Sequence, residues 1–235
     1  MNCFVAEDRR KKLTFYGHSA FALEIAGQRI LIDPFLTGNP VNTTPADQVQ
    51  ADFIVVSHGH GDHVGDTIEI ARRTNALVIS NHEICLWLQK QGVARTHDMH
   101  LGGSHQFPFG NLKLTVAHHG SVLPDGTYGG NPAGLLFRTA EGNVYHAGDT
   151  ALFSDMSLIG AVGLKAAILP VGDNYTMGPE DSLAAIRLLQ PQIAIPCHYS
   201  TFPLISQDIE QWSQQVRQHT NARPLVMAPG STTEL

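Results

Sequence analysis

The stretch HGHGDH at residues 58–63 brings three histidines and one aspartate together in a chain that has 13 histidines among 235 residues. Imidazole nitrogens and carboxylate oxygens are good ligands for Zn²⁺, Mn²⁺ or Fe²⁺. The two intervening glycines carry no side chains and allow a tight loop around an ion. A polar surface loop would account for one histidine, but poorly for this set. The candidate ligands are His58, His60, Asp62 and His63.

Three further segments have an apolar run that leads to a histidine or an aspartate and then to a small residue. These are LTVAHHGS with His118 and His119, VYHAGDT with His146 and Asp149, and IAIPCHYS with Cys197 and His198. If each run is a strand, the strand ends deliver ligands to one edge of a sheet, where α/β proteins place their sites. One tetrahedral ion does not need so many ligands, which favours two metals.

The elements that must position these residues follow from hydrophobic patterning. Strands are expected at 13–17, 21–27, 28–34, 51–57, 76–80, 105–109, 112–118, 133–140, 142–148, 166–172, 193–198 and 224–229. Helices are expected at 65–73, 82–92, 151–160, 179–190 and 206–220. Gly27–Gln28 is a candidate hairpin corner, and Asn81 a candidate helix cap. This order predicts a layered α/β fold, and no Pro/Gly/Ser-rich linker divides it into two domains.

Composition limits the classes of partner and location. With 43% hydrophobic and 15% charged residues, the chain has the composition of a globular protein. The net charge of −6 argues against binding to nucleic acid, so a small-molecule substrate is expected. No apolar stretch is long enough to span a bilayer, and no signal peptide is evident. The three cysteines are odd in number and far apart, which favours reduced thiols in the cytoplasm. Oligomeric state stays open.

The motif HGHGDH resembles the H-x-H-x-D-H motif of the metallo-β-lactamase superfamily, and the later histidines and aspartate follow in that family's order. A closer resemblance, to metal-dependent hydrolases of the UPF0173 type, rests on GHSAF, HDMHLGGSHQF, YHAGDTALFSDM, LPVGDNYTMGPED and IPCHYSTFP. The resemblance implies an αββα four-layer sandwich over residues 13–235, with residues 1–12 as an N-terminal extension. It also implies a two-metal cleft at one edge of the sheets.

The resemblance further implies a ligand set. The first metal would be held by His58, His60 and His119, the second by Asp62, His63 and His198, and Asp149 would bridge the two. His118 is the alternative to His119. The family places this ligand just before a small residue, here Gly120, which favours His119. The nitrogen and oxygen donors suit zinc best, and manganese or iron also fit.

Such a centre predicts hydrolysis. Two ions about 3.5–4 Å apart would share a hydroxide that is nucleophilic near neutral pH. It would attack a carbonyl carbon or a phosphorus atom, while Asp62 holds the water and passes a proton on. The expected activity is hydrolysis of a small-molecule ester, lactone, amide or phosphoester.

Other polar residues lie near these motifs. His18, in GHSAF, is expected near the cleft, either supporting a ligand or contacting substrate. His146 and His118 are expected to orient ligands rather than bind metal. Asn174, Tyr175 and Thr176 either contact substrate or form a polar helix-entry loop. His97, His100 and His105 are interpreted as lining a wall, and Cys197 as pointing into the core.

Three alternatives remain. A phosphodiesterase or RNA-processing relative fits the motif, although the acidic charge argues against it. Flavodiiron proteins share the fold, but they have a glutamate where this chain has His60. A non-catalytic metal-binding module is also possible in principle, but every expected ligand is present.

Overall fold

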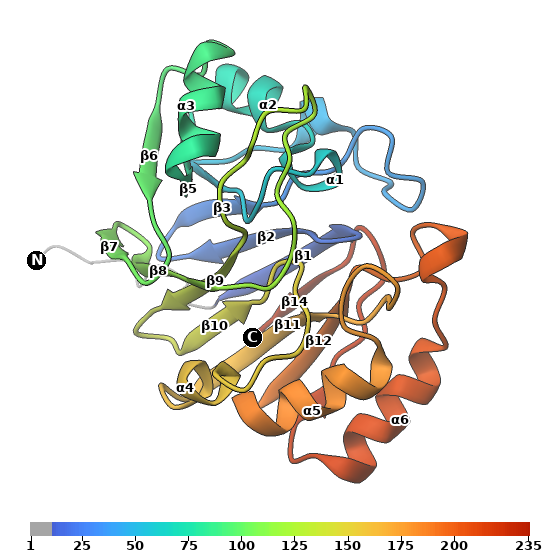
Figure 1. Cartoon of the computed structure of the whole chain (residues 1–235). Helices are drawn as coiled ribbons and strands as arrows, with labels where there is room; N and C mark the ends of the chain where they lie inside the picture. The colour runs from blue at the N-terminus through green and yellow to red at the C-terminus, as the bar shows by residue number, and fades with distance from the viewer. Residues whose placement is uncertain (1–10) are drawn as a thin grey trace, which may run out of the picture.

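The computed structural model describes residues 11–235, which form two β-sheets stacked face to face (Figure 1). Residues 1–10 of the expected extension lie outside the described residues. The first strand begins at Lys12, just before the expected start of the domain at Leu13. Lys11 is buried, and its Nζ donates a hydrogen bond to the carbonyl of Gly142 (2.5 Å). Lys11 and Lys12 therefore belong to the folded domain.

The first sheet is antiparallel at one end and parallel at the other. Its strands are, in spatial order, β14 (Thr232–Glu234), β1 (Lys12–Gly17), β2 (Ala20–Ile25), β3 (Gln28–Ile32), β4 (Phe53–Val55), β5 (Leu77–Asn81) and β6 (Thr96–Met99). Neighbouring strands from β14 to β3 are antiparallel, and neighbouring strands from β3 to β6 are parallel. Ala26 and Gly27 join β2 to β3 with φ of 50° and 72°, as a two-residue type I′ hairpin turn requires.

The second sheet also combines parallel and antiparallel strands. Its strands are, in spatial order, β13 (Arg223–Pro224), β12 (Ile193–Cys197), β11 (Leu164–Pro170), β10 (Asn143–His146), β9 (Ala133–Arg138), β8 (Gly110–Val116) and β7 (Ser104–Phe107). Strands β10 to β13 pair parallel, and β7 to β10 pair antiparallel. The parallel strands β11 and β12 are almost wholly buried, as the apolar sequence of β12 and the apolar run that follows Lys165 in β11 predict.

Helices cover the outer face of each sheet, so the molecule has four layers (Figure 1). The first sheet is covered by α1 (Gly61–Val64), α2 (Thr67–Thr74) and α3 (His82–Lys90). The second is covered by α4 (Met156–Gly160), α5 (Pro179–Leu189) and α6 (Ile209–His219). One apolar core fills the space between the sheets, with Phe21, Leu23 and Phe137 fully buried in it. These layers confirm the predicted αββα sandwich.

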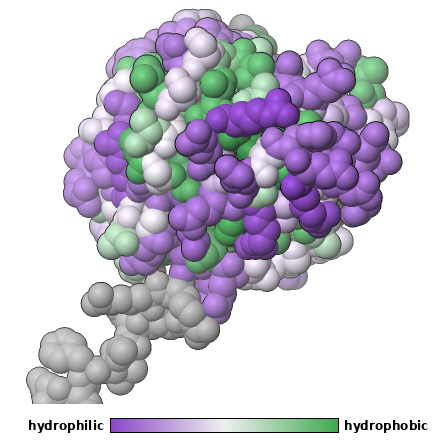
Figure 2. All heavy atoms as spheres, turned by 90° about the horizontal axis from the view of Figure 1, so that it is seen from below, coloured by the Kyte–Doolittle hydropathy of each residue, from purple (hydrophilic) through white to green (hydrophobic). Residues whose placement is uncertain are grey.

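The helices turn polar residues outward. Figure 2 shows the face seen from below, where hydrophilic side chains predominate and hydrophobic ones are interspersed. The inward residues Trp212 and Val216 of α6 are buried against the second sheet. Such amphipathic helices are stabilised mainly by packing. Across residues 11–235, no helix combines the length and apolar character that crossing a membrane requires.

Most predicted elements are present, with informative exceptions. Asn81 caps α3 as predicted, because its side chain accepts a hydrogen bond from the Ile84 amide. The helix expected over 151–160 begins only at Met156. The strand expected over 224–229 reduces to the short β13. The edge strands β6 and β14 were not predicted, since their sequences are short and mostly polar.

The two sheets are joined by backbone hydrogen bonds at the edge where β4, β8, β10 and β12 end. The amide of Ala133 in the second sheet donates to the carbonyl of Ser57, which follows β4 (3.0 Å). The amide of His198, after β12, donates to the carbonyl of His18, after β1 (2.8 Å). Residues from distant parts of the sequence are thus fixed close together at this edge.

Candidate functional site

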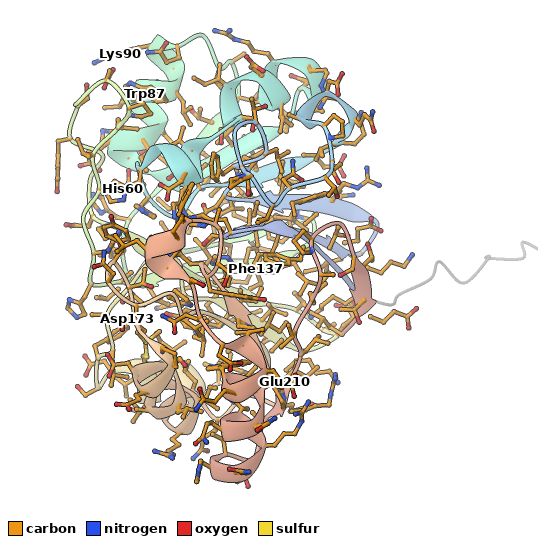
Figure 3. The ribbon with its side chains drawn as sticks, turned by 90° about the vertical axis from the view of Figure 1, so that its right-hand side faces the viewer. His60, Trp87, Lys90, Phe137, Asp173 and Glu210 are labelled. Atoms are coloured by element: carbon orange, nitrogen blue, oxygen red, sulfur yellow. The ribbon has the colours of Figure 1, made fainter. Side chains whose placement is uncertain are left out.

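A cleft of about 360 Å³ lies at this common edge. The residues that line it are His18, His60, Asp62, His119, Asp149, Tyr175, His198, Phe202 and Ile205. They come from loops that follow strands of both sheets. Figure 3 shows His60 and Asp173 along the same side of the molecule, with Phe137 in the interior. The cleft is therefore shared between the two halves of the fold.

Asp149 lies at the centre of the histidine cluster. Its Oδ2 is 3.0 Å from the Nε2 of His198, 3.3 Å from that of His63, 3.5 Å from that of His119 and 4.0 Å from that of His58. Asp149 is 2% exposed. One carboxylate oxygen thus faces ring nitrogens from four separate positions in the chain.

Gly148 lets Asp149 reach this place. Its φ is 62°, and a Cβ there would lie 2.8 Å from the carbonyl oxygen of Ala133. A side chain would therefore both strain the backbone and clash with the neighbouring strand. No helix begins near Ala151, since α4 starts at Met156. Asp149 therefore does not cap a helix at the expected start of 151–160.

Two groups of potential ligands flank Asp149. The first consists of His58, His60 and His119, whose nearest ring nitrogens lie within 4.8 Å of one another. Within it, His58 Nε2 and His60 Nδ1 are 3.0 Å apart. The second consists of Asp62 and His63, after β4, with His18 and His198, after β1 and β12. The structure thus brings together all seven residues that the resemblance pointed to, and adds His18 beside them.

Asp33 and Ser57 orient two of these histidines, and neither was identified in the sequence. Asp33 is fully buried, and its Oδ2 accepts hydrogen bonds from His63 Nδ1 (2.9 Å) and Ser57 Oγ (2.6 Å). Because the Ser57 hydroxyl donates to Asp33, it accepts from His58 Nδ1 (3.0 Å). With Nδ1 of each ring engaged in this way, Nε2 is the nitrogen that faces Asp149 in both histidines. The sequence signal was present, because ILIDP also ends an apolar run in an aspartate.

The site leaves buried polar atoms without hydrogen-bond partners. These atoms are His63 Nε2, Asp149 Oδ1 and His198 Nδ1. Buried polar groups are rarely left unpaired in native proteins. Nε2 of His63 and Oδ1 of Asp149 are donor atoms that a bound cation would satisfy. The residues present therefore fit a divalent metal centre of nitrogen and oxygen ligands.

Burial and mutual repulsion keep most of these imidazoles neutral. Burial lowers the pKa of His58 well below the usual value, and His63 beside it acts in the same direction. Burial also lowers the pKa of His60 and that of His119. Neutral imidazole is the form that binds metal.

At His63 the pKa shift has the opposite direction, because two carboxylates lie beside the ring. Burial lowers its pKa, but Asp149 and Asp33 outweigh burial and raise the pKa well above the usual value. Burial raises the pKa of Asp149, but His63 and His198 outweigh it and hold the pKa well below the usual value. Asp149 is therefore ionised and carries a negative charge at the centre of the histidine cluster.

His18 connects Asp62 to the loop after β12. Its Nε2 lies 3.1 Å from Asp62 Oδ2, and its Nδ1 lies 2.9 Å from Thr201 Oγ1. Burial lowers the pKa of His18 to about 4, although Asp62 opposes the shift. Neutral His18 can then donate from Nε2 to Asp62 and accept at Nδ1 from Thr201. Burial raises the pKa of Asp62, but the His18 hydrogen bond and the charge of His63 lower it below the usual range.

His146 and His118 lie outside the ligand groups. His146 is fully buried, with Nδ1 accepting from the Gly148 amide (3.1 Å) and Nε2 facing the Ser19 carbonyl (3.3 Å). It therefore holds the backbone just before Asp149. His118 is exposed, and its ring packs edge-on against Phe153 with centroids 5.1 Å apart.

The remaining candidates divide between the cleft and other surfaces. Tyr175 lines the cleft, whereas Asn174 is exposed with φ of 55° and does not. His97 and His105 pack against each other where β6 and β7 meet, with centroids 4.3 Å apart. Neither they nor the exposed His100 join any potential metal group among residues 11–235. Cys197 lies in the core between the sheets, as predicted.

Comparison with known proteins agrees with this architecture. The model of the β-lactamase superfamily domain matches residues 28–199. A UPF0173 metal-dependent hydrolase of Bacillus cereus is 51% identical over 215 residues, which cover 89% of this chain and 94% of that protein.

Solved structures show the same fold. Igni18, a metallo hydrolase from the archaeon Ignicoccus hospitalis, superimposes with a TM-score of 0.88 at 39% identity, covering 96% of this chain and 98% of that one. An isothiocyanate hydrolase from Delia radicum gut bacteria shares the fold with a TM-score of 0.76 at 22% identity, covering 95% and 98%. Together with the histidine and aspartate cluster, these matches show that the chain belongs to the metallo-β-lactamase superfamily and, within it, to the UPF0173 metal-dependent hydrolases.

Proposed function

We propose that the cleft holds two divalent metal ions and hydrolyses an ester, lactone, amide or phosphoester bond in a small molecule. The observation that carries the proposal is the position of Asp149 Oδ2, within 4.0 Å of four histidine nitrogens. A purely structural role would not need a buried carboxylate with one unpaired oxygen among so many imidazoles. A carboxylate has two oxygens and can contact two ions.

The two groups of potential ligands suggest how the ions are divided. His58, His60 and His119 would hold one ion, and Asp62, His63 and His198 the other, with Asp149 between them. Zinc suits this donor set best, and manganese or iron is compatible. When bound, such a pair makes a water molecule nucleophilic near neutral pH and polarises the substrate oxygen.

The chain's own residues prepare the reaction. Asp33 and Ser57 fix the rings of His63 and His58, so that Nε2 of each faces the centre of the site. His18 holds Asp62 by a hydrogen bond at 3.1 Å. Asp62 lines the cleft and is partly exposed, so it can accept a proton from a reacting water and release it to solvent.

The first test is metal content. Protein purified without chelator and loaded with zinc should contain about two metal equivalents per chain by elemental analysis. A reproducible value of one or less in metal-replete buffer would contradict a dinuclear centre. Turnover of a generic phosphodiester and of a panel of lactones should depend on the metal and disappear on chelation. Metal-replete protein without any hydrolysis would instead favour a metal-binding module.

Two further properties stay proposals. We place the protein in the cytoplasm, since Cys85 and Cys197 are free and buried rather than paired. We also propose that it acts on a small molecule and not on nucleic acid, in keeping with the net charge of −6.

A further inference from the structure

None of the residues that line the cleft, all of them in the described part of the chain, is a lysine or an arginine. Lysine and arginine are also missing from three longer stretches of the sequence, residues 30–71, 166–186 and 188–216. These ranges include the loops that follow β3, β4, β11 and β12, which build most of the cleft.

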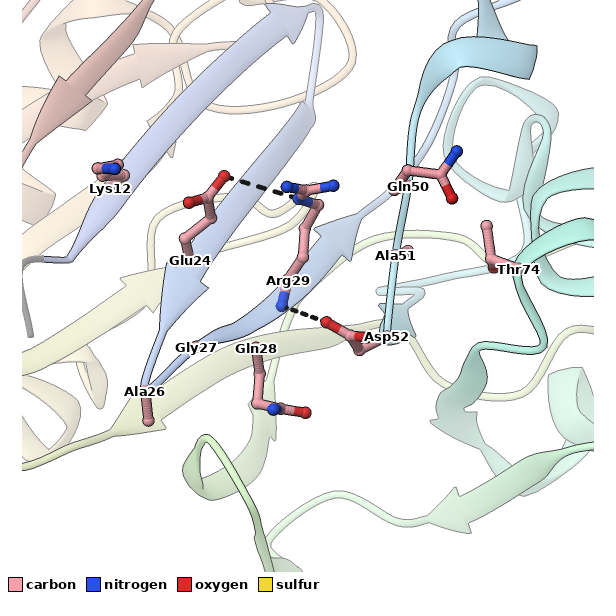
Figure 4. A pocket seen from close by; sticks show the side chains of 10 residues that line it. All are labelled: Lys12, Glu24, Ala26, Gly27, Gln28, Arg29, Gln50, Ala51, Asp52 and Thr74. Atoms are coloured by element: carbon pink, nitrogen blue, oxygen red, sulfur yellow. Dashed lines mark hydrogen bonds and ion pairs between the residues drawn. The ribbon is translucent and has the colours of Figure 1, made fainter. Parts of the chain in front are cut away.

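Basic residues occur instead at the opposite ends of the same strands. Arg29 lies near the start of β3, whereas Asp33 follows its end. Arg29 and Lys12 line a separate pocket beside the β2–β3 turn, where Arg29 pairs with Glu24 (Figure 4). Lys90, at the end of α3, lies above His60 in Figure 3 and is not among the residues that line the cleft. Among the described residues, these cations do not belong to the lining of the cleft.

Acidic groups remain on the cleft side. Asp62 lines the cleft, and the exposed Asp173 lies in the loop that carries Tyr175. Bound cations would attract the reacting group of a substrate. The rest of the substrate would meet no lysine or arginine in the described lining of the cleft, and a negative group there would lose hydration without gaining a partner.

The cleft offers apolar surface in place of charge. Phe202 is 39% exposed and Tyr175 is 57% exposed, although both are large aromatic residues at the cleft. Phe202 also packs edge-on against the His18 ring, with centroids 5.8 Å apart. Exposed aromatic side chains that gather at a cleft mark binding surface.

The loop that carries Phe202 is held in place by hydrogen bonds. The Ser200 amide donates to the Ile205 carbonyl (2.7 Å), and Gln207 Nε2 donates to the Gly172 carbonyl (2.9 Å). The short 3-10 helix Pro203–Ile205 completes the loop. Phe202 is therefore presented to the cleft by a fixed backbone, as a preformed binding wall requires.

We propose that this cleft selects uncharged substrates with an apolar substituent, which packs against Phe202 and Tyr175, and that it discriminates against substrates with an anionic group at that place. The inference rests on the proposed metal centre, because the reacting group must be anchored there. It narrows the substrate class to neutral esters, lactones and amides with an apolar substituent, and it argues against substrates such as dicarboxylate esters that would place an anionic group against Phe202 and Tyr175.

A matched pair of metal-binding probes tests the inference without requiring turnover. Hydroxamates chelate the metal with one end and place their substituent in the cleft. The pair is 4-isopropylbenzohydroxamate and 4-carboxybenzohydroxamate, which differ in charge but little in shape. Acetohydroxamate reports on the metal centre alone. On zinc-loaded full-length protein, calorimetry should show the isopropyl probe binding about tenfold more tightly than the carboxy probe.

Substitution of Phe202 should change the preference for the isopropyl probe. Phe202→Lys places a cation beside the cleft and removes apolar surface, so the preference should fall to about equal or reverse. Leu86→Lys is the matched control, since Leu86 is 42% exposed on α3 and far from the cleft. It adds the same charge and should leave the tenfold preference unchanged.

The outcomes separate the two proposals. If acetohydroxamate binds but the carboxy probe binds as tightly as the isopropyl probe, the substrate inference is wrong and the metal centre stands. If no hydroxamate binds to zinc-treated protein, the metal centre fails and the inference fails with it. A preference that survives Phe202→Lys unchanged would also overturn the inference, because the proposed wall would then not be its source.

Discussion

Asp149 is the carboxylate around which the histidines of the site gather. Its Oδ2 faces the ring nitrogens of His58, His63, His119 and His198. In the proposed centre a histidine could not replace it, since one nitrogen lone pair contacts one ion. A neutral amide could not replace it there either, because two neighbouring cations would repel each other without a negative charge between them.

We expect Asp149→Asn to stay folded but to lose most bound metal and its hydrolytic activity. The amide keeps the shape of the side chain and removes its charge. Elemental analysis and circular dichroism on the same sample would measure both effects. Asp155→Asn, in the exposed N-cap of α4, is the control and should retain metal. Normal metal content and turnover in Asp149→Asn would contradict the bridging role.

Neighbouring histidines can be compared directly. His119 Nε2 lies 3.5 Å from Asp149 Oδ2, while His118 is exposed against Phe153. We therefore expect His119→Ala to lose metal and His118→Ala to keep nearly all of it. Metal content per folded chain, determined for both variants in parallel, is the measurement. The reverse order would exchange the two assignments.

The carboxylate of Asp33 should matter although it lies outside the ligand groups. It accepts from His63 Nδ1 and from Ser57, so Asp33→Asn removes the charge that orients the His63 ring. Loss of such a supporting carboxylate costs about 10–100-fold in metal affinity. Competition with a zinc chelator would measure this. Asp52→Asn, which affects only a hydrogen bond from the Arg29 amide at the other end of β3, should leave affinity unchanged.

At the scale of elements, strand ends and the loops that follow them form the site. β4, β8, β10 and β12 stop at one edge, and each is followed by a histidine or an aspartate of the cluster. Their interiors are buried and hold the loops at fixed positions. Function in α/β folds is commonly placed in such loops for this reason.

Asn81, the N-cap of α3, also holds the loop between β8 and β9. Asn81 accepts from the Ile84 amide and donates to the carbonyls of Gly129 and Asn131, in the loop between β8 and β9. Asp208, the cap of α6, accepts only from Gln211 and is exposed. Asn81→Ala should therefore cost about 2 kcal/mol of unfolding free energy, and Asp208→Ala about 1 kcal/mol or less. Urea denaturation of both variants is the measurement. Equal losses of unfolding free energy would contradict a stabilising role of Asn81 in the loop between β8 and β9.

At the scale of the whole molecule, the proposed metal centre links the two sheets. His58 and His63 follow a strand of the first sheet, whereas His119 and His198 follow strands of the second. Ions bound to both groups would hold the halves of the sandwich together. Metal binding to the folded state alone stabilises it by mass action.

Removal of metal should therefore lower stability as well as activity. We expect chelator-treated protein to unfold at a lower temperature than zinc-loaded protein, with recovery when zinc is added back. The physical reason is that the unfolded chain lacks the preformed site. Thermal denaturation of Asp149→Asn is the control, since chelator should change it much less. An identical transition for wild-type protein with and without metal would contradict a centre that links the sheets.

The sequence by itself determined the chemistry and the fold. Ligand types, their spacing in HGHGDH and the apolar runs before His119, Asp149 and His198 are local features that can be read along the chain. They predicted a layered α/β fold, and the family resemblance that they support implied the αββα sandwich and the residues that the structure gathers around Asp149. Edge strands such as β6 escaped detection because their pairing depends on a neighbour and not on their own pattern.

Only the tertiary structure decided which polar residues support the ligands and what surrounds them. Asp33 contacts His63 across 30 positions of sequence, and Thr201 contacts His18 across 183. The opposite placement of Arg29 and the cleft likewise depends on which end of β3 faces the site. Such contacts arise from packing between distant segments, and no local pattern records them. The physical reason is that hydrogen bonds and charges act through space, whereas spacing in a sequence reports only neighbours along the chain.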